Sequence, residues 1–181
     1  ISEDVLNKIS AAQLQILVAH ELFHILTRYD LNFKKSVYQT IGFTVLDREI
    51  IFPTDIMEKR ISNPDISRYD SYAPFTVKGT IQNYTMMTYT DRPYTGGDIF
   101  DYMKIGLIPL NDHFVPVQES GKTVIVPIEQ AEDFYEKIGK NTNYVINPEE
   151  VLADNFAYML TEKKDLPNPE VISRIREVLK K

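Results

Sequence analysis

Two histidines one helical turn apart, with a glutamate directly after the first, form the H-E-x-x-H pattern His20-Glu21-Leu22-Phe23-His24. In a helix, residues i and i+4 share a face, so His20 and His24 can direct imidazole nitrogens at one point. Zinc accepts such nitrogens at about 2.0 to 2.1 Å. Glu21 would lie beside the metal, where a carboxylate can take a proton from a zinc-bound water. The pattern therefore predicts a Zn²⁺ site with His20 and His24 as ligands and Glu21 as catalytic base.

A catalytic zinc usually has three protein ligands and leaves its fourth position to water, so the sequence should supply one more ligand. The first candidate is Glu150, which lies in a predicted helix one turn before Asp154. Because these two carboxylates share a helix face, Glu150 could bind zinc while Asp154 orients one of the motif histidines. An ordinary role for Glu150 would be that of a first-turn acid favoured by the helix dipole.

Two other residues compete for the third position. Asp30 follows His24 by six residues, but a ligand there needs the helix to end sharply, and no glycine lies nearby to allow it. His113, beside Asp112 on the edge of a predicted strand, is the other candidate. It could instead donate a hydrogen bond to a reaction intermediate, or be a simple surface or packed histidine.

The pairing of His-Glu-Leu-Phe-His with the downstream Glu150-Val-Leu-Ala-Asp154 resembles the gluzincin class of zinc metallopeptidases, which includes the thermolysin-like enzymes. That class carries a Glu third ligand one turn before an Asp that supports a ligating histidine. The resemblance implies that His20, His24 and Glu150 bind Zn²⁺. It also implies that Glu21 is the catalytic base and that Asp154 supports a ligating histidine. Considered whole, the chain looks most like a bacterial zincin-like protein.

The sequence departs from that class in two ways. The interval from His24 to Glu150 is 126 positions, far longer than the helix-loop-helix spacing of thermolysin-like enzymes. A strand-rich insertion must therefore fold so that both helices meet, and we expect it to contribute walls of the cleft. In Asn147-Pro148-Glu149-Glu150, Glu149 is an alternative ligand, but its i+4 partner is Ala153, which favours Glu150.

These residues predict a zinc metallopeptidase that hydrolyses peptide bonds in a peptide or protein substrate. A further donor should stabilise the tetrahedral oxygen of the transition state, and the candidates are His113, Tyr144 and Tyr158. The alternative is a zincin-like protein that binds zinc in a binding or regulatory role without cleaving peptides. A toxin-like or cell-wall-directed hydrolase with the same chemistry is a third possibility.

We expect an α+β fold in one domain over residues 1–181, because the length suits a single core. A capping box at Ser10 and Gln13 should begin a buried helix that reaches about Arg28, and a short helix could precede it from Ser2 to Asn7. Further helices are predicted at 129–138, 149–162 and 169–179, and a helical turn at 55–59. A strand is expected at 41–46, two strands or one bulged strand at 75–90, and a hairpin at 113–128.

Composition excludes several classes. The net charge of −6, without any run of like charges, argues against nucleic acid as a partner. No apolar stretch is long enough for a transmembrane helix. With no cysteine, any metal must be bound by His, Asp and Glu. Because the chain opens at Ile1 rather than methionine, either a targeting segment has been removed or the chain has been shortened, and its compartment stays open.

Overall fold

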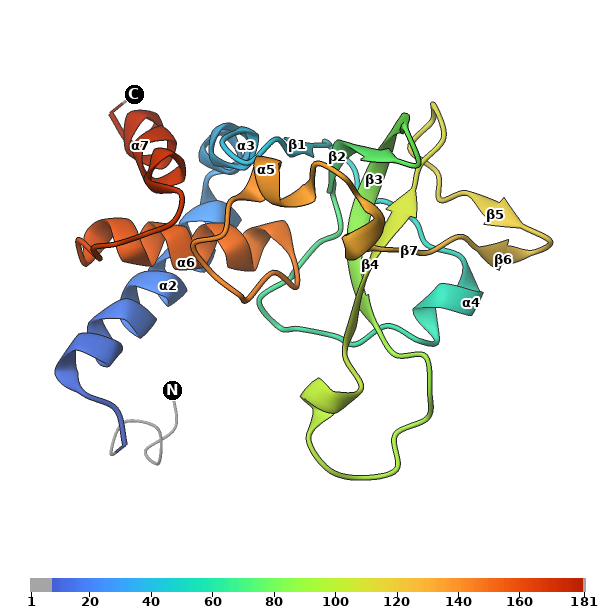
Figure 1. Cartoon of the computed structure of the whole chain (residues 1–181), viewed down its shortest axis with the longest axis horizontal. Coiled ribbons are helices and arrows are strands. Elements are labelled where there is room, and N and C mark those ends of the chain that lie inside the picture. The colour runs from blue at the N-terminus through green and yellow to red at the C-terminus, as the bar shows by residue number, and fades with distance from the viewer. Residues whose placement is uncertain (1–7, 181) are drawn as a thin grey trace.

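Most helices gather at one end of the molecule and an antiparallel sheet, with the short helix α4 beside it, lies at the other, as Figure 1 shows for a computed structural model that describes residues 8–180. The chain therefore has the α+β fold that the sequence predicts. The helices are α2 (Ala11–Tyr29), α3 (Leu31–Gln39), α4 (Thr54–Met57), α5 (Phe134–Ile138), α6 (Pro148–Leu160) and α7 (Pro169–Val178), with short 3₁₀ helices η1 (Ile99–Asp101) and η2 (Ile128–Gln130). The helix predicted from Ser2 to Asn7 lies outside the described residues.

Helix α2 begins at the predicted capping box. The Ser10 hydroxyl accepts a hydrogen bond from the Gln13 amide, and the Gln13 side chain accepts one from the Ser10 amide at 2.8 Å. The prediction that α2 is buried all round is wrong. One stripe of the helix packs on α6, whereas Val18, Leu22 and Ile25 are 41 to 53% exposed. Helix α2 carries more apolar residues than its packed face can bury, so some of them stay exposed to solvent.

Helix α6 is the most buried helix in the described part of the chain and packs directly against α2 (Figure 1). It begins where the sequence predicts. The Asn147 side chain accepts a hydrogen bond from the Glu149 amide, and Pro148 occupies the first turn, where its missing N–H costs nothing. Because Phe23 of α2 and Phe156 of α6 are 5.5 Å apart between ring centroids, an apolar contact fixes how the two helices meet.

Within residues 8–180, a five-stranded sheet has the order β1-β2-β3-β4-β7, with every pair antiparallel. Its strands are β1 (Thr44–Val45), β2 (Ser71–Val77), β3 (Thr80–Tyr89), β4 (Lys104–Pro109) and β7 (Val126–Pro127); β5 (Gln118–Glu119) and β6 (Lys122–Thr123) form a separate hairpin. The segment 75–90, predicted as two strands or one bulged strand, contains the end of β2 and all of β3, and the chain turns between them at Lys78-Gly79, where both residues have positive φ.

Several predicted elements are shorter than expected. The strand expected at 41–46 is reduced to Thr44–Val45, because the chain is still turning at Gly42. The helix expected at 129–138 begins only at Phe134, after the η2 turn, and ends at Gly139 with φ of +77°. Strand β4, the partner of β3, was not predicted, although Ile105 to Ile108 is a short apolar run.

The sheet and helices share one core, in which Phe23, Phe75, Phe134 and Leu152 are fully or almost fully buried. A smaller cluster around Ile56, Met87 and Ile108 lies on the side of the sheet near α4. In the described part of the chain, no helix is both long and apolar enough to span a membrane.

Candidate metal centre

The two segments that carry the predicted site lie together although they are far apart in sequence. His20, Glu21 and His24 are on α2, and Glu150 and Asp154 are on α6, the helix against which α2 packs. The long interval between His24 and Glu150 holds α3, α4, α5 and the sheet, and it leaves α2 and α6 in direct contact. The predicted meeting of the two helices is confirmed.

His20 lies between two carboxylates of α6. Its Nδ1 donates a hydrogen bond to Asp154 at 2.9 Å, and its Nε2 is 3.1 Å from Glu150 Oε2. Burial lowers the pKa of His20, but the hydrogen bonds and charges of Asp154 and Glu150 outweigh it and raise the pKa to about 10. In the metal-free protein, the proton on Nε2 thus stands where a metal cation would bind.

His24 is held by a third carboxylate. Its Nδ1 donates to Glu149 Oε1 at 3.1 Å, while its buried Nε2 has no hydrogen-bond partner. Because an ionised carboxylate only accepts, this contact places the proton on Nδ1 and the lone pair on Nε2. An unpaired nitrogen buried in this way costs free energy unless something occupies its lone pair. A metal ion would do so.

The two Nε2 atoms and Glu150 Oε2 converge on one point. His24 Nε2 is 3.8 Å from Glu150 Oε2, and His20 Nε2 is 3.1 Å from the same oxygen. Two donors on a tetrahedral ion at about 2.0 to 2.1 Å from each are roughly 3.3 Å apart. His20, His24 and Glu150 therefore form a group that could hold a metal ion. Two nitrogens and one carboxylate oxygen are a donor set that suits zinc.

Glu150 has its second oxygen occupied by another segment. Asn63 donates from Nδ2 to Glu150 Oε1 at 2.7 Å, which leaves Oε2 to face the histidines. Glu150 itself is only 1% exposed, so this hydrogen bond and the histidines satisfy a carboxylate that water barely reaches. The arrangement favours one-oxygen coordination by Glu150.

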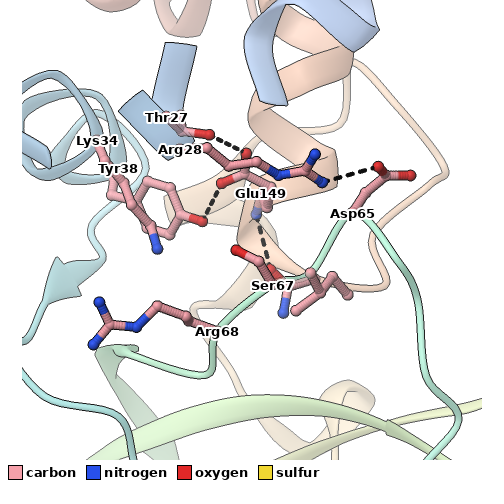
Figure 2. Close-up of a pocket in the computed structure, with 10 residues that line it drawn as sticks. Thr27, Arg28, Lys34, Tyr38, Asp65, Ser67, Arg68 and Glu149 are labelled. Atoms are coloured by element: carbon pink, nitrogen blue, oxygen red, sulfur yellow. Dashed lines mark hydrogen bonds and ion pairs between the residues drawn. The ribbon is translucent and has the colours of Figure 1, made fainter. Parts of the chain in front are cut away.

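Glu21 lies beside this group rather than within it. Glu21, His24 and Asp65 have potential ligand atoms within 4.8 Å of one another. The Asp65 carboxylate is also 3.2 Å from the Arg28 guanidinium (Figure 2). Glu21 is thus close enough to the metal position to serve as the predicted base for an attacking water, and Asp65 borders the same space.

A cleft of about 360 Å³ opens over the centre. The residues that line it come from α2, from α6 and from the loops before β2 and before α6, and they are Gln13, Ile16, Leu17, His20, Glu21, Asp65, Tyr144, Glu150 and Asp154. Burial, followed by the charges of Glu150, Asp65 and Asp154, raises the pKa of Tyr144 to about 12. Its phenol therefore stays protonated at neutral pH and can donate a hydrogen bond.

The structure separates the remaining sequence candidates from the centre. Asp30 caps α3 by accepting from the Phe33 amide at 2.9 Å. His113 is exposed, and its backbone carbonyl accepts from Arg48. Tyr158 lies under the Lys163 ammonium, 3.8 Å from its ring centroid, and does not line the cleft. Of the three predicted donors, only Tyr144 borders the metal group.

Four residues in contact with the centre were not predicted from sequence. Thr142 donates from its hydroxyl to Asp154, and Asn63 binds Glu150. Thr27 and Tyr38 both donate to Glu149 at 2.5 Å, as Figure 2 shows. Asn63, Tyr38 and Thr142 belong to no recognisable spacing, because they reach the site from other elements through the tertiary fold. Only Thr27 had a signal, since it follows His24 by three residues and so lies on the same helix face.

Comparison of the chain with protein-family models, with curated proteins and with solved structures gives no match.

Proposed function

We propose that this protein is a zinc-dependent metallopeptidase of the gluzincin type. The observation that carries the proposal is the convergence of His20 Nε2, His24 Nε2 and Glu150 Oε2 at 3.1 to 3.8 Å beside the Glu21 carboxylate. A metal that served stability alone would need no free carboxylate next to it and no open cleft above it. This centre has both.

When bound, zinc would polarise the scissile carbonyl and lower the pKa of a coordinated water toward about 7. The protein supplies the proton transfers. Glu21 takes a proton from the attacking water and then delivers it to the leaving amine, which turns a poor leaving group into a good one. The phenolic hydroxyl of Tyr144 donates a hydrogen bond to the oxygen on which negative charge develops. Asp154 keeps the His20 ring in place throughout.

The test is the Glu21→Gln variant, which keeps the size of the side chain but removes the base. Zinc content should stay equal to that of the wild type, while cleavage of a mixed-sequence peptide library should fall at least about 10²-fold. A His24→Ala variant should lose both zinc and cleavage. The matched control is Glu58→Gln, at an exposed glutamate after α4 that lies outside the cleft.

Peptide cleavage that survives Glu21→Gln would overturn the assigned base. Wild-type protein that binds zinc tightly but cleaves nothing in the library would instead support a zinc-binding protein without peptidase activity.

A further inference from the structure

We infer that Glu149, clamped by Thr27 and Tyr38, is the positioning residue of His24 and sets how tightly the centre holds its metal. This inference rests on the proposed metal site. It goes beyond that proposal because the gluzincin resemblance accounts for one supporting carboxylate, Asp154, on one ligating histidine, and assigns no such role to Glu149. In this chain each ligating histidine has its own carboxylate.

Glu149 points inward rather than into solvent. It is 6% exposed, and the neighbouring cavity of about 20 Å³ is little larger than a water molecule. An ordinary first-turn acid would interact with the helix dipole from the surface. The Glu149 carboxylate instead makes its hydrogen bonds to side chains of α2 and α3. Figure 2 shows those from Thr27 and Tyr38.

The donors from His24, Thr27 and Tyr38 are divided between the two carboxylate oxygens of Glu149. Oε1 accepts from His24 Nδ1 at 3.1 Å and from the Thr27 hydroxyl at 2.5 Å, and Oε2 accepts from the Tyr38 hydroxyl at 2.5 Å. The Thr27 and Tyr38 hydroxyls together fix the orientation of the Glu149 carboxylate plane. That orientation in turn fixes the His24 ring, whose Nε2 then faces Glu150 Oε2.

The chemistry requires an acceptor that cannot donate. A carboxylate at this position forces the His24 proton onto Nδ1 and leaves the Nε2 lone pair for the metal. A glutamine has the same shape, but its NH₂ group can donate to Nδ1 and stabilise the opposite tautomer, in which Nε2 carries the proton. Because His24 is 1% exposed, water cannot rescue the correct tautomer.

The experiment measures zinc affinity of the full chain by competition with a chromogenic chelator at fixed neutral pH. Glu149→Gln should weaken zinc binding about 10- to 100-fold. The downfield proton signal of His24 Nδ1–H in the zinc-loaded protein should also be lost or shifted, which a change in stability alone would not produce. Glu170→Gln is the matched control, because Glu170 follows Asn168-Pro169 at the start of α7 as Glu149 follows Asn147-Pro148, but is exposed.

Tyr38→Phe and Thr27→Val carry the test if Glu149→Gln does not fold. Each removes one donor to the carboxylate while keeping its own shape, and each should weaken zinc binding by about fivefold, the equivalent of one ordinary hydrogen bond. Wild-type protein without zinc affinity would overturn the metal site itself. Wild-type protein that binds zinc, with variants that bind it equally well, would overturn only the role of Glu149.

Discussion

At the scale of single residues, the centre consists of three potential ligand atoms and the side chains that orient them. His20 is held by Asp154, His24 by Glu149 and Glu150 by Asn63. Since a buried polar group is costly without a partner, these contacts also limit the alternative rotamers of each ligand. Tyr144 differs from them because it borders the cleft and has a phenol that stays protonated.

Tyr144→Phe should therefore reduce catalysis without removing the metal. If the phenol stabilises the developing oxyanion, loss of the hydroxyl should lower kcat by about 10²- to 10³-fold and leave KM and zinc content nearly unchanged. Steady-state kinetics on a peptide cleaved by the wild type would measure this. Tyr158→Phe, on the same helix as Asp154 but outside the cleft, should leave kcat unchanged. Equal effects of the two variants would remove Tyr144 from the mechanism.

At the scale of elements, the site depends on how α2 meets α6. Phe23 is fully buried between them, 5.5 Å from Phe156 and 6.3 Å from the His24 ring between centroids. The helix contact is thus apolar at the same turn of α2 that carries His24. Packing of this pair, rather than the H-E-x-x-H motif alone, brings the α6 carboxylates to the histidines.

Phe23→Ala should cost about 3 to 5 kcal/mol of unfolding free energy, because it opens a cavity in a packed core. It should also weaken zinc binding, since α2 would lose its fixed position on α6. Urea denaturation with and without a chelator would measure both effects. The neighbouring Leu22→Ala is the control, because Leu22 is 41% exposed and should cost no more than about 0.5 kcal/mol. Comparable losses in the two variants would contradict this account of the helix contact.

At the scale of the whole molecule, the middle of the chain folds into a sheet beside the helix pair and sends two loops back to it. Asn63 and Asp65 lie on the loop before β2, and Tyr144 lies on the loop before α6. The prediction that the insertion contributes walls of the cleft therefore holds for its loops. The uncharged stretch Thr85 to Thr88 belongs to β3, and each of its residues pairs with β4.

The metal-free protein should lose stability as pH rises because of His20. Its pKa of about 10 lies above the value near 6.5 of an unfolded histidine. The contribution of His20 to the free energy of unfolding is therefore complete below about pH 6.5 and is lost as pH approaches 10. In urea denaturation with a chelator, the free energy of unfolding of the wild type should exceed that of His20→Gln most at pH 6. This difference in unfolding free energy should vanish near pH 10. A difference that grows with pH would contradict the assigned ion pairing.

The sequence alone predicted much of the local structure, because caps and periodicity act between near neighbours. The Ser10 capping box, the Asn147-Pro148 start of α6 and the Gly139 helix end all follow from backbone groups that neighbouring side chains satisfy. The i and i+4 spacing likewise placed His20 with His24 and Glu150 with Asp154. Strand β4 escaped prediction because its short apolar run becomes a strand only beside β3.

Tertiary structure alone decided which residues complete the centre. Nothing in the local pattern of Asn63, Tyr38 or Thr142 marks a site residue, since each reaches the ligands from an element far away in the chain. The choice between Glu149 and Glu150 depended on the same packing, which turned Glu150 toward both Nε2 atoms and Glu149 toward Nδ1 of His24. Sequence spacing fixes which side chains share a helix face, but only the packing of helices fixes which faces meet.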